Sequence, residues 1–213
     1  MAAVYLEVGS KKVFAASLDW PGWGRFAKTD EAALEALAEY GPRYAPIATE
    51  AGFKFPASPS FRVVQRLPGT ATTEFGAPDG VAEADSAPVT PANATRFVKL
   101  LSAAWSAFDR YAASAPQELR KGPRGGGRDR DKMIAHVIDA ETAYARKIGV
   151  KHRAPSIDDR DAIAALREEI IAVLGAPNDG GPLTPTGWPS RYAVRRIAWH
   201  VLDHLWEMED RST

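Results

Sequence analysis

The sequence predicts an α+β protein in which a small sheet-and-helix part precedes a four-helix bundle. Val4, Leu6 and Val8 alternate along a first strand, Gly9-Ser10-Lys11 supplies a turn and the mainly apolar residues 13–18 return, which is typical of a β-hairpin. After Thr90 the apolar residues recur every three or four positions, which is the helical period. Between these regions, residues 76–91 are rich in Gly, Pro, Ala and acidic residues, as linkers are. We therefore expect a domain at 1–75, a linker at 76–91 and a second domain at 92–213.

The first domain continues after the hairpin with a loop, a helix and more strands. The loop spans residues 19–24 and leads to a short strand at 25–27. Thr29 is a good N-cap for a helix from Asp30 to about Tyr44, because its side chain can accept a hydrogen bond from a free backbone N–H. We expect two further strands at 61–67 and 71–75.

This order of elements resembles that of the HicB-like family. The resemblance covers about the first 50 residues, and the residues that carry it are Asp19, Pro21, Gly22, Thr29, Glu31, Ala32, Ala33 and Leu34. It implies a ββαβ-type module, which in that family pairs with a small toxin and often carries a DNA-binding tail. A module that only packs or dimerises is the alternative.

Four amphipathic segments follow the linker, at about 91–115, 130–148, 156–174 and 190–210. Pro91 suits the first turn of the first helix, and Ser156 is the expected N-cap of the third. Four helices of this length in one domain predict a four-helix bundle.

The composition excludes several classes of function. The formal net charge of the 213 residues is zero, so no overall positive field attracts nucleic acid or a membrane surface. The sequence has no cysteine, so it can form neither a disulfide nor a thiolate metal site. No apolar run is long enough to span a membrane and no export signal is evident, so we expect a cytoplasmic protein.

Three of the four histidines lie on the apolar sides of predicted helices. His200 and His204 are four residues apart on the last helix, so their side chains lie one turn apart on the same face. His136 borders the apolar stripe of the second bundle helix. Three imidazoles can bind a divalent metal and leave a position open, as in catalytic sites. Histidines bonded to carboxylates or backbone at the edge of a core are the alternative.

This histidine pattern resembles that of the DinB-like metal-binding four-helix bundles, a superfamily that includes thiol-dependent S-transferases and maleylpyruvate isomerases. The similarity spans residues 88–213 and implies that His136, His200 and His204 are metal ligands. It further implies a divalent metal, zinc first and nickel second, and often a homodimer.

We expect a metal-dependent S-transferase that joins a low-molecular-weight thiol to a small electrophilic substrate. Glu207, three residues after His204, is the candidate acid/base or orienting residue, and Asp139 and Asp203 could bond a neighbouring ring. A basic loop could bind the anionic part of the thiol, through residues Arg120, Lys121, Arg124 and Arg128. A hydrolase and a non-catalytic metal-binding regulatory or interaction module are the alternatives.

Overall fold

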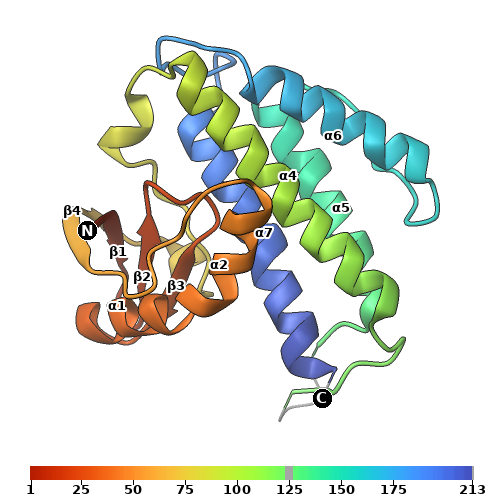
Figure 1. The fold of residues 1–213 in the computed structure, drawn as a ribbon, viewed down its shortest axis with the longest axis horizontal. Coiled ribbons are helices and arrows are strands. Elements are labelled where there is room, and N and C mark those ends of the chain that lie inside the picture. The colour runs from red at the N-terminus through yellow and green to blue at the C-terminus, as the bar shows by residue number, and fades with distance from the viewer. Residues whose placement is uncertain (123–126, 213) are drawn as a thin grey trace.

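The computed structural model describes residues 1–122 and 127–212 and begins with a mixed four-stranded sheet (Figure 1). The strands are β1 (Ala2–Val8), β2 (Val13–Ser17), β3 (Gly24–Ala27) and β4 (Phe61–Pro68), in the order β3-β2-β1-β4. The predicted hairpin is confirmed, because β1 and β2 pair antiparallel. At the other edge β4 runs parallel to β1, since the chain first crosses one face of the sheet as helices.

The helix expected from Asp30 to about Tyr44 is wrong as a single element. It consists of α1 (Asp30–Glu39) and α2 (Gly41–Glu50), with Pro42 in the first turn of α2. Proline has no backbone N–H, so Pro42 cannot continue the hydrogen bonds of α1, whereas the first turn of a new helix needs no such bond. Thr29 caps α1 as expected, because its side chain accepts a hydrogen bond from the Ala32 N–H.

The strand expected at 71–75 is also wrong, because these residues form the short helix α3 (Ala71–Glu74). The Thr70 side chain accepts a hydrogen bond from the Thr72 N–H, and the Thr73 hydroxyl accepts one from the Thr70 N–H. Gly76, with φ of +90°, then turns the chain. These local bonds favour a helical turn over the β propensity of two threonines.

Side chains on both faces of the sheet are buried. Val4 and Leu6 point to the face covered by α1 and α2, where Leu37 is fully buried. Tyr5 and Phe14 point to the opposite face, where they join Trp199 of the last helix. The period of two along each strand therefore places the sheet between two helical layers.

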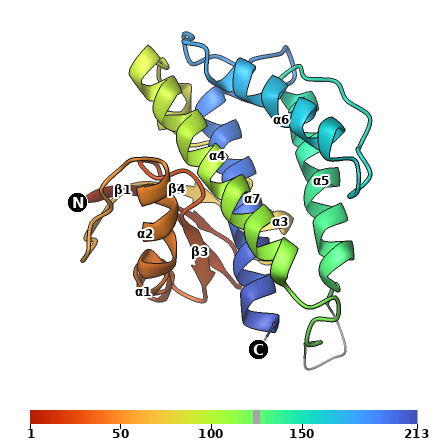
Figure 2. The same ribbon diagram turned by 45° about the vertical axis from the view of Figure 1, so that its right-hand side comes forward.

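The second half consists of α4 (Pro91–Ser114), α5 (Arg130–Lys147), α6 (Arg160–Leu174) and α7 (Ser190–Arg211). This confirms the four predicted helices. Asp159 rather than Ser156 caps α6, since its side chain accepts the Ala162 N–H. In Figures 1 and 2, α7 lies between the sheet and the other long helices, and α6 lies farthest from the sheet.

The segment 76–91 is held against α7 and buries more than its composition suggests. It contains the 3₁₀ helix η1 (Glu83–Ser86), in which Asp85 is 1% exposed. The Asp85 carboxylate accepts two hydrogen bonds from the buried guanidinium of Arg195 on α7, one of them 3.1 Å long. The division into domains at 1–75 and 92–213 stays a prediction.

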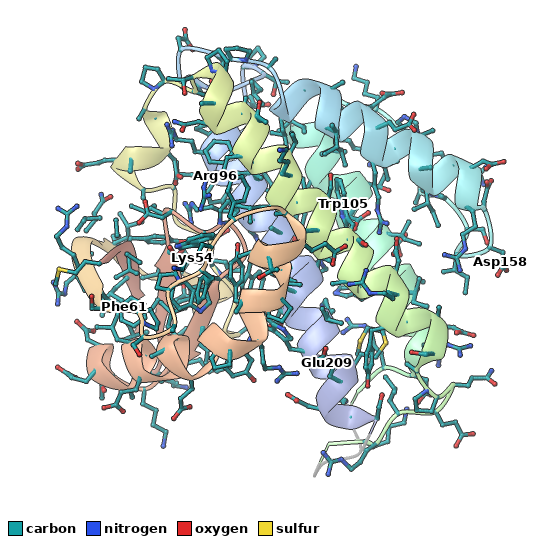
Figure 3. The ribbon with its side chains drawn as sticks, in the orientation of Figure 1. Lys54, Phe61, Arg96, Trp105, Asp158 and Glu209 are labelled. Carbon is teal, nitrogen blue, oxygen red and sulfur yellow. The ribbon has the colours of Figure 1, made fainter. Side chains whose placement is uncertain are left out.

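One continuous hydrophobic core includes residues of the sheet, α1, α2, α4, α5, α6 and α7. Figure 3 shows side chains filling the space between the N-terminal elements and α4, with Arg96 at this contact. The Arg96 guanidinium lies 4.2 Å from the ring centroid of Trp20 and 4.4 Å from that of Phe53. Within the described residues, no helix has the length and apolar composition that crossing a membrane requires.

Candidate metal centre

His136 of α5 meets His200 and His204 of α7 at the predicted cluster. One nitrogen of each ring lies within 4.8 Å of the others, and His136 Nε2 is 3.3 Å from His200 Nε2. The ring centroids of His136 and His204 are 4.8 Å apart, and those of His200 and His204 are 4.6 Å apart. The structure therefore brings together the three residues that the sequence predicts as ligands.

The spacing of these nitrogens fits a small divalent metal. Two nitrogens about 2.0–2.1 Å from zinc at a tetrahedral angle are roughly 3.3–3.4 Å apart. The distance between His136 Nε2 and His200 Nε2 has this value, and a nitrogen of His204 lies within 4.8 Å of both. The donor set of three neutral nitrogens suits zinc, nickel or another first-row ion better than magnesium or calcium.

The environment of the rings favours neutral imidazoles, which are the form that binds metal. His200 is 7% exposed and His204 is 8% exposed. Burial, with the neighbouring His204 and Arg128, lowers the pKa of His136 to about 4. Burial, together with the neighbouring His204 and Arg196, also lowers the pKa of His200 well below its ordinary value.

Glu207 orients one of the three rings. Its Oε2 atom is 2.9 Å from His204 Nδ1, which leaves Nε2 of that ring for a metal. Its Oε1 atom is 2.9 Å from the Arg211 guanidinium. The hydrogen bond to His204 lowers the pKa of Glu207, so the carboxylate is ionised. Metal-binding histidines are commonly held this way by a carboxylate on the second nitrogen.

Asp203, the neighbour of His204, faces the sheet instead of the histidines. Its Oδ1 atom accepts a 2.8 Å hydrogen bond from Arg25 of β3. Burial raises the pKa of this carboxyl, although Arg25 acts in the opposite direction. Asp139 of α5 is exposed but close enough to raise the pKa of His136 by its charge. Neither aspartate hydrogen-bonds a cluster ring in the parts of the chain described.

The basic loop is only partly placed at the cluster. Arg128 is the member whose charge acts on His136, His200 and Glu207. Arg120 donates a 2.8 Å hydrogen bond to the Asp210 carbonyl at the end of α7, and Lys121 pairs with Asp129. Arg124 lies outside the described residues. Binding of a cosubstrate by this loop stays a prediction, and Arg128 is its best-placed member.

Two further residues lie at the cluster and were missed in the sequence. The Tyr144 ring stands edge-on to His200, with centroids 5.6 Å apart, and the Arg196 guanidinium lies 5.1 Å from the centroid of Tyr144. Their spacing from the histidines in the sequence could have identified them. Arg196 precedes His200 by one helical turn, and Tyr144 follows His136 by about two turns.

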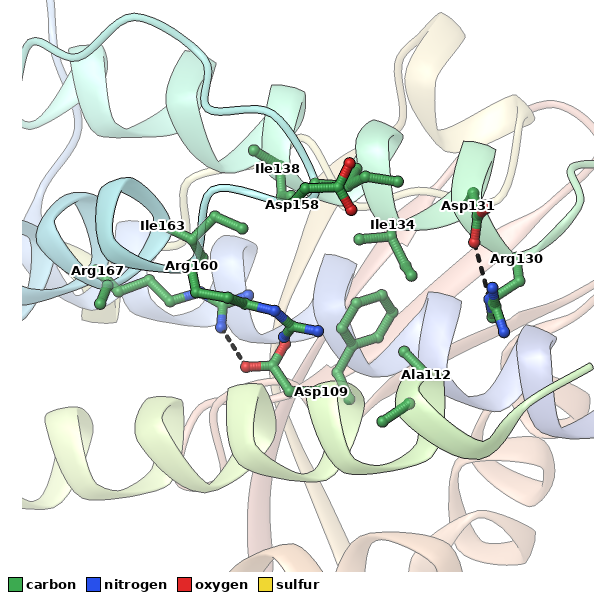
Figure 4. A pocket seen from close by; sticks show the side chains of 14 residues that line it. Asp109, Ala112, Arg130, Asp131, Ile134, Ile138, Asp158, Arg160, Ile163 and Arg167 are labelled. Atoms are coloured by element: carbon green, nitrogen blue, oxygen red, sulfur yellow. Dashed lines mark hydrogen bonds and ion pairs between the residues drawn. The ribbon is translucent and has the colours of Figure 1, made fainter. Parts of the chain in front are cut away.

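A cavity of about 390 Å³ between α4, α5 and α6 is separate from the histidines (Figure 4). Ile134 and Ile138 contribute to its apolar wall, whereas Arg167 and Asp109 pair at its rim with a distance of 2.6 Å. His136 lies two residues from each of these isoleucines, so it projects from the other side of α5.

Neither the HicB-like nor the DinB-like resemblance has independent support, because comparison of the chain with protein-family models, curated proteins and solved structures found no match.

Proposed function

We propose that the protein is a metal-dependent enzyme that transfers a small cellular thiol to an electrophilic substrate. The observation that supports this most is the cluster of three histidines, which no fourth potential ligand joins within the described residues. Structural zinc sites are normally closed by four protein ligands, whereas catalytic sites keep one position for a substrate. Zinc is the preferred metal and nickel the second choice.

The metal, when bound, supplies Lewis acidity that lowers the pKa of a coordinated thiol. The chain would hold the metal with the three rings, and it fixes the tautomer of His204. Glu207 accepts the Nδ1 proton of His204, and the buried environment keeps His200 neutral. The sequence has no cysteine, so the attacking sulfur must come from a cosubstrate. The positive charge of Arg128 beside the cluster favours an anionic cosubstrate such as a thiol with a carboxylate.

The contacts of Glu207 favour an orienting role over proton transfer. Both of its oxygens are engaged, one by His204 and the other by Arg211. A free carboxylate would be the better general base, since a base must reach the proton it removes. We therefore assign Glu207 to ligand positioning, and the acid/base role stays the alternative.

The first test is metal content. Purified wild-type protein should hold about one divalent ion per chain, and His200→Ala should lose most of it. His152→Ala is the matched control, because this histidine pairs with Glu169 at 2.8 Å, away from the cluster. Full metal content in His200→Ala, measured by elemental analysis, would reject the three-histidine site.

The second test is thiol dependence. Metal-loaded protein is mixed with a reactive aryl halide and with mycothiol, bacillithiol or glutathione, and thioether and halide are quantified. We expect turnover only with added thiol, and none in His200→Ala. Substrate loss without thiol would mean hydrolysis. Metal binding with neither thiol-dependent turnover nor thiol binding would favour the non-catalytic module. Light scattering in the same buffers tests the homodimer that the resemblance implies.

A further inference from the structure

A second group of buried polar atoms lies where α7 crosses the sheet. Four buried side-chain atoms have no hydrogen-bond partner among the described residues, and three of them are the Tyr5 hydroxyl, Arg196 Nη1 and Trp199 Nε1. The side chains that carry these three atoms all line one narrow cavity of about 10 Å³. Unpaired buried polar groups are rare in proteins, so three at a single cavity point to a bound species.

The groups at this cavity are hydrogen-bond donors. Trp199 Nε1 and Arg196 Nη1 can only donate, and a tyrosine hydroxyl can donate as well as accept. Ser17 also lines the cavity, and its oxygen already accepts the N–H groups of Asp19 and Trp20, both at 3.2 Å. Its own proton is therefore available to another acceptor. A water molecule would accept from two of these groups and would still need acceptors for its own hydrogens.

The charge at the cavity is positive. Arg195 lines it but is neutralised by the buried carboxylate of Asp85. Arg196 makes no ion pair with any described residue, and its guanidinium lies 4.9 Å from the ring centroid of Trp199. Arginine stays protonated even where it is buried. An uncompensated cation among donor groups favours an anion over a neutral molecule.

The size of the cavity restricts the anion. A space of about 10 Å³ holds roughly one water-sized body. The walls come close together because Gly22 and Gly24 lie at the contact with α7 and β2. A Cβ on Gly22 would be 2.8 Å from Leu202 Cδ1, and one on Gly24 would be 2.8 Å from Phe14. A phosphate or a carboxylate ligand does not fit between these walls.

We propose that this cavity binds a monatomic anion of the size of chloride. Tyr5, Ser17, Arg196 and Trp199 would donate to it from the sheet and from α7, so the ion would join these two elements. The proposal does not depend on the metal-centre function, because none of the three histidines lines this cavity.

The direct test is a crystal of the wild-type protein grown or soaked in sodium bromide. An anomalous peak at the cavity, within hydrogen-bonding reach of Trp199 Nε1 and Arg196 Nη1, is the expected result. A non-anomalous oxygen-sized peak there would mean that the cavity holds water and would overturn the proposal.

Thermal unfolding gives an independent test. At constant ionic strength, gluconate is replaced by chloride. Each tenfold increase in chloride concentration above the dissociation constant should raise the unfolding temperature by roughly 3–6 °C. Trp199→Phe keeps an aromatic ring but removes the donor, so its unfolding temperature should lose most of this dependence. Trp188→Phe is the control, because Trp188 lies on Tyr144 and Tyr192, outside the cavity wall. An equal chloride effect in both variants, or no effect in the wild type, would contradict the proposal.

Discussion

Glu207 shows how one carboxylate can orient a ring of the candidate metal site. Its bond to His204 Nδ1 turns the other nitrogen of that ring towards His136 and His200. The apolar stripes of the two helices placed the three histidines towards the interior, and the family resemblance implied that they meet. The sequence could not predict which nitrogen of each ring faces the cluster, because that depends on side-chain contacts. Nor could it predict that Asp203 bonds Arg25, which lies 178 residues away.

We expect Glu207→Gln to weaken metal binding by about 10–100-fold. The neutral amide is a poorer partner for His204 Nδ1, so the ring is less well fixed. Competition with a chromophoric chelator would measure the affinity, and Glu168→Gln, on the exposed face of α6, is the control. If the variant binds metal normally but loses turnover at saturating metal, Glu207 is the acid/base residue instead.

The cluster should also make the metal-free protein sensitive to acid. The pKa of His136 in the folded protein is about 4, below the ordinary value of 6.5. As the pH falls, the unfolded chain is therefore protonated at this residue before the folded protein is. Stability from the neutral ring is therefore present above about pH 6.5 and is lost as the pH falls towards 4. His200 acts in the same direction.

Urea unfolding of chelator-treated protein between pH 8 and 5 would measure this loss. The variant His136→Gln should show a flatter dependence of unfolding free energy on pH than the wild type does. His152→Gln should retain the wild-type dependence. A wild-type profile that is flat over this range would show that His136 is not held neutral by the fold.

At the scale of the elements, sequence periodicity predicted α4, α5, α6 and α7 well because each buries one continuous apolar stripe. It failed for α1 and α2, where the helical period continues through Pro42 although the backbone cannot. It also failed at α3, where a few side-chain bonds outweigh propensity. The composition of 76–91 gave no sign of packing, since its decisive contact is a single buried charge, Asp85.

Removing one partner of the Asp85–Arg195 pair should lower the stability of the protein strongly. Both side chains are almost fully buried, with exposures of 1% and 6%, so Asp85→Ala leaves a buried guanidinium without its carboxylate. We expect a loss of about 3–5 kcal/mol in the free energy of unfolding. Glu50→Ala, which breaks the exposed pair with Arg110, should cost less than about 1 kcal/mol. Urea denaturation of both variants would compare the two, and similar losses would contradict this account.

At the scale of the whole molecule, the sheet and the bundle share one core, although the change in sequence pattern suggested two domains. We expect a single unfolding transition in which far-UV circular dichroism and tryptophan fluorescence coincide. A fragment of residues 88–213 would expose Trp199 and Leu202, which are buried here, and should bind hydrophobic dyes. A fragment that folds with native helix content would show that the bundle is independent.

Helix α7 connects the histidine cluster with the N-terminal sheet. One side of this helix bears His200 and His204, and the residue between them that pairs with the sheet is Asp203. A metal bound by these histidines and the contact of Asp203 with β3 would therefore both act on the position of α7. Coupling between two sites is reciprocal. If a metal at the histidines changes the affinity of β3 for another molecule, that molecule changes the affinity for the metal by the same factor. Metal bound at the histidines would then be coupled, through Asp203 and Arg25, to whatever binds β3.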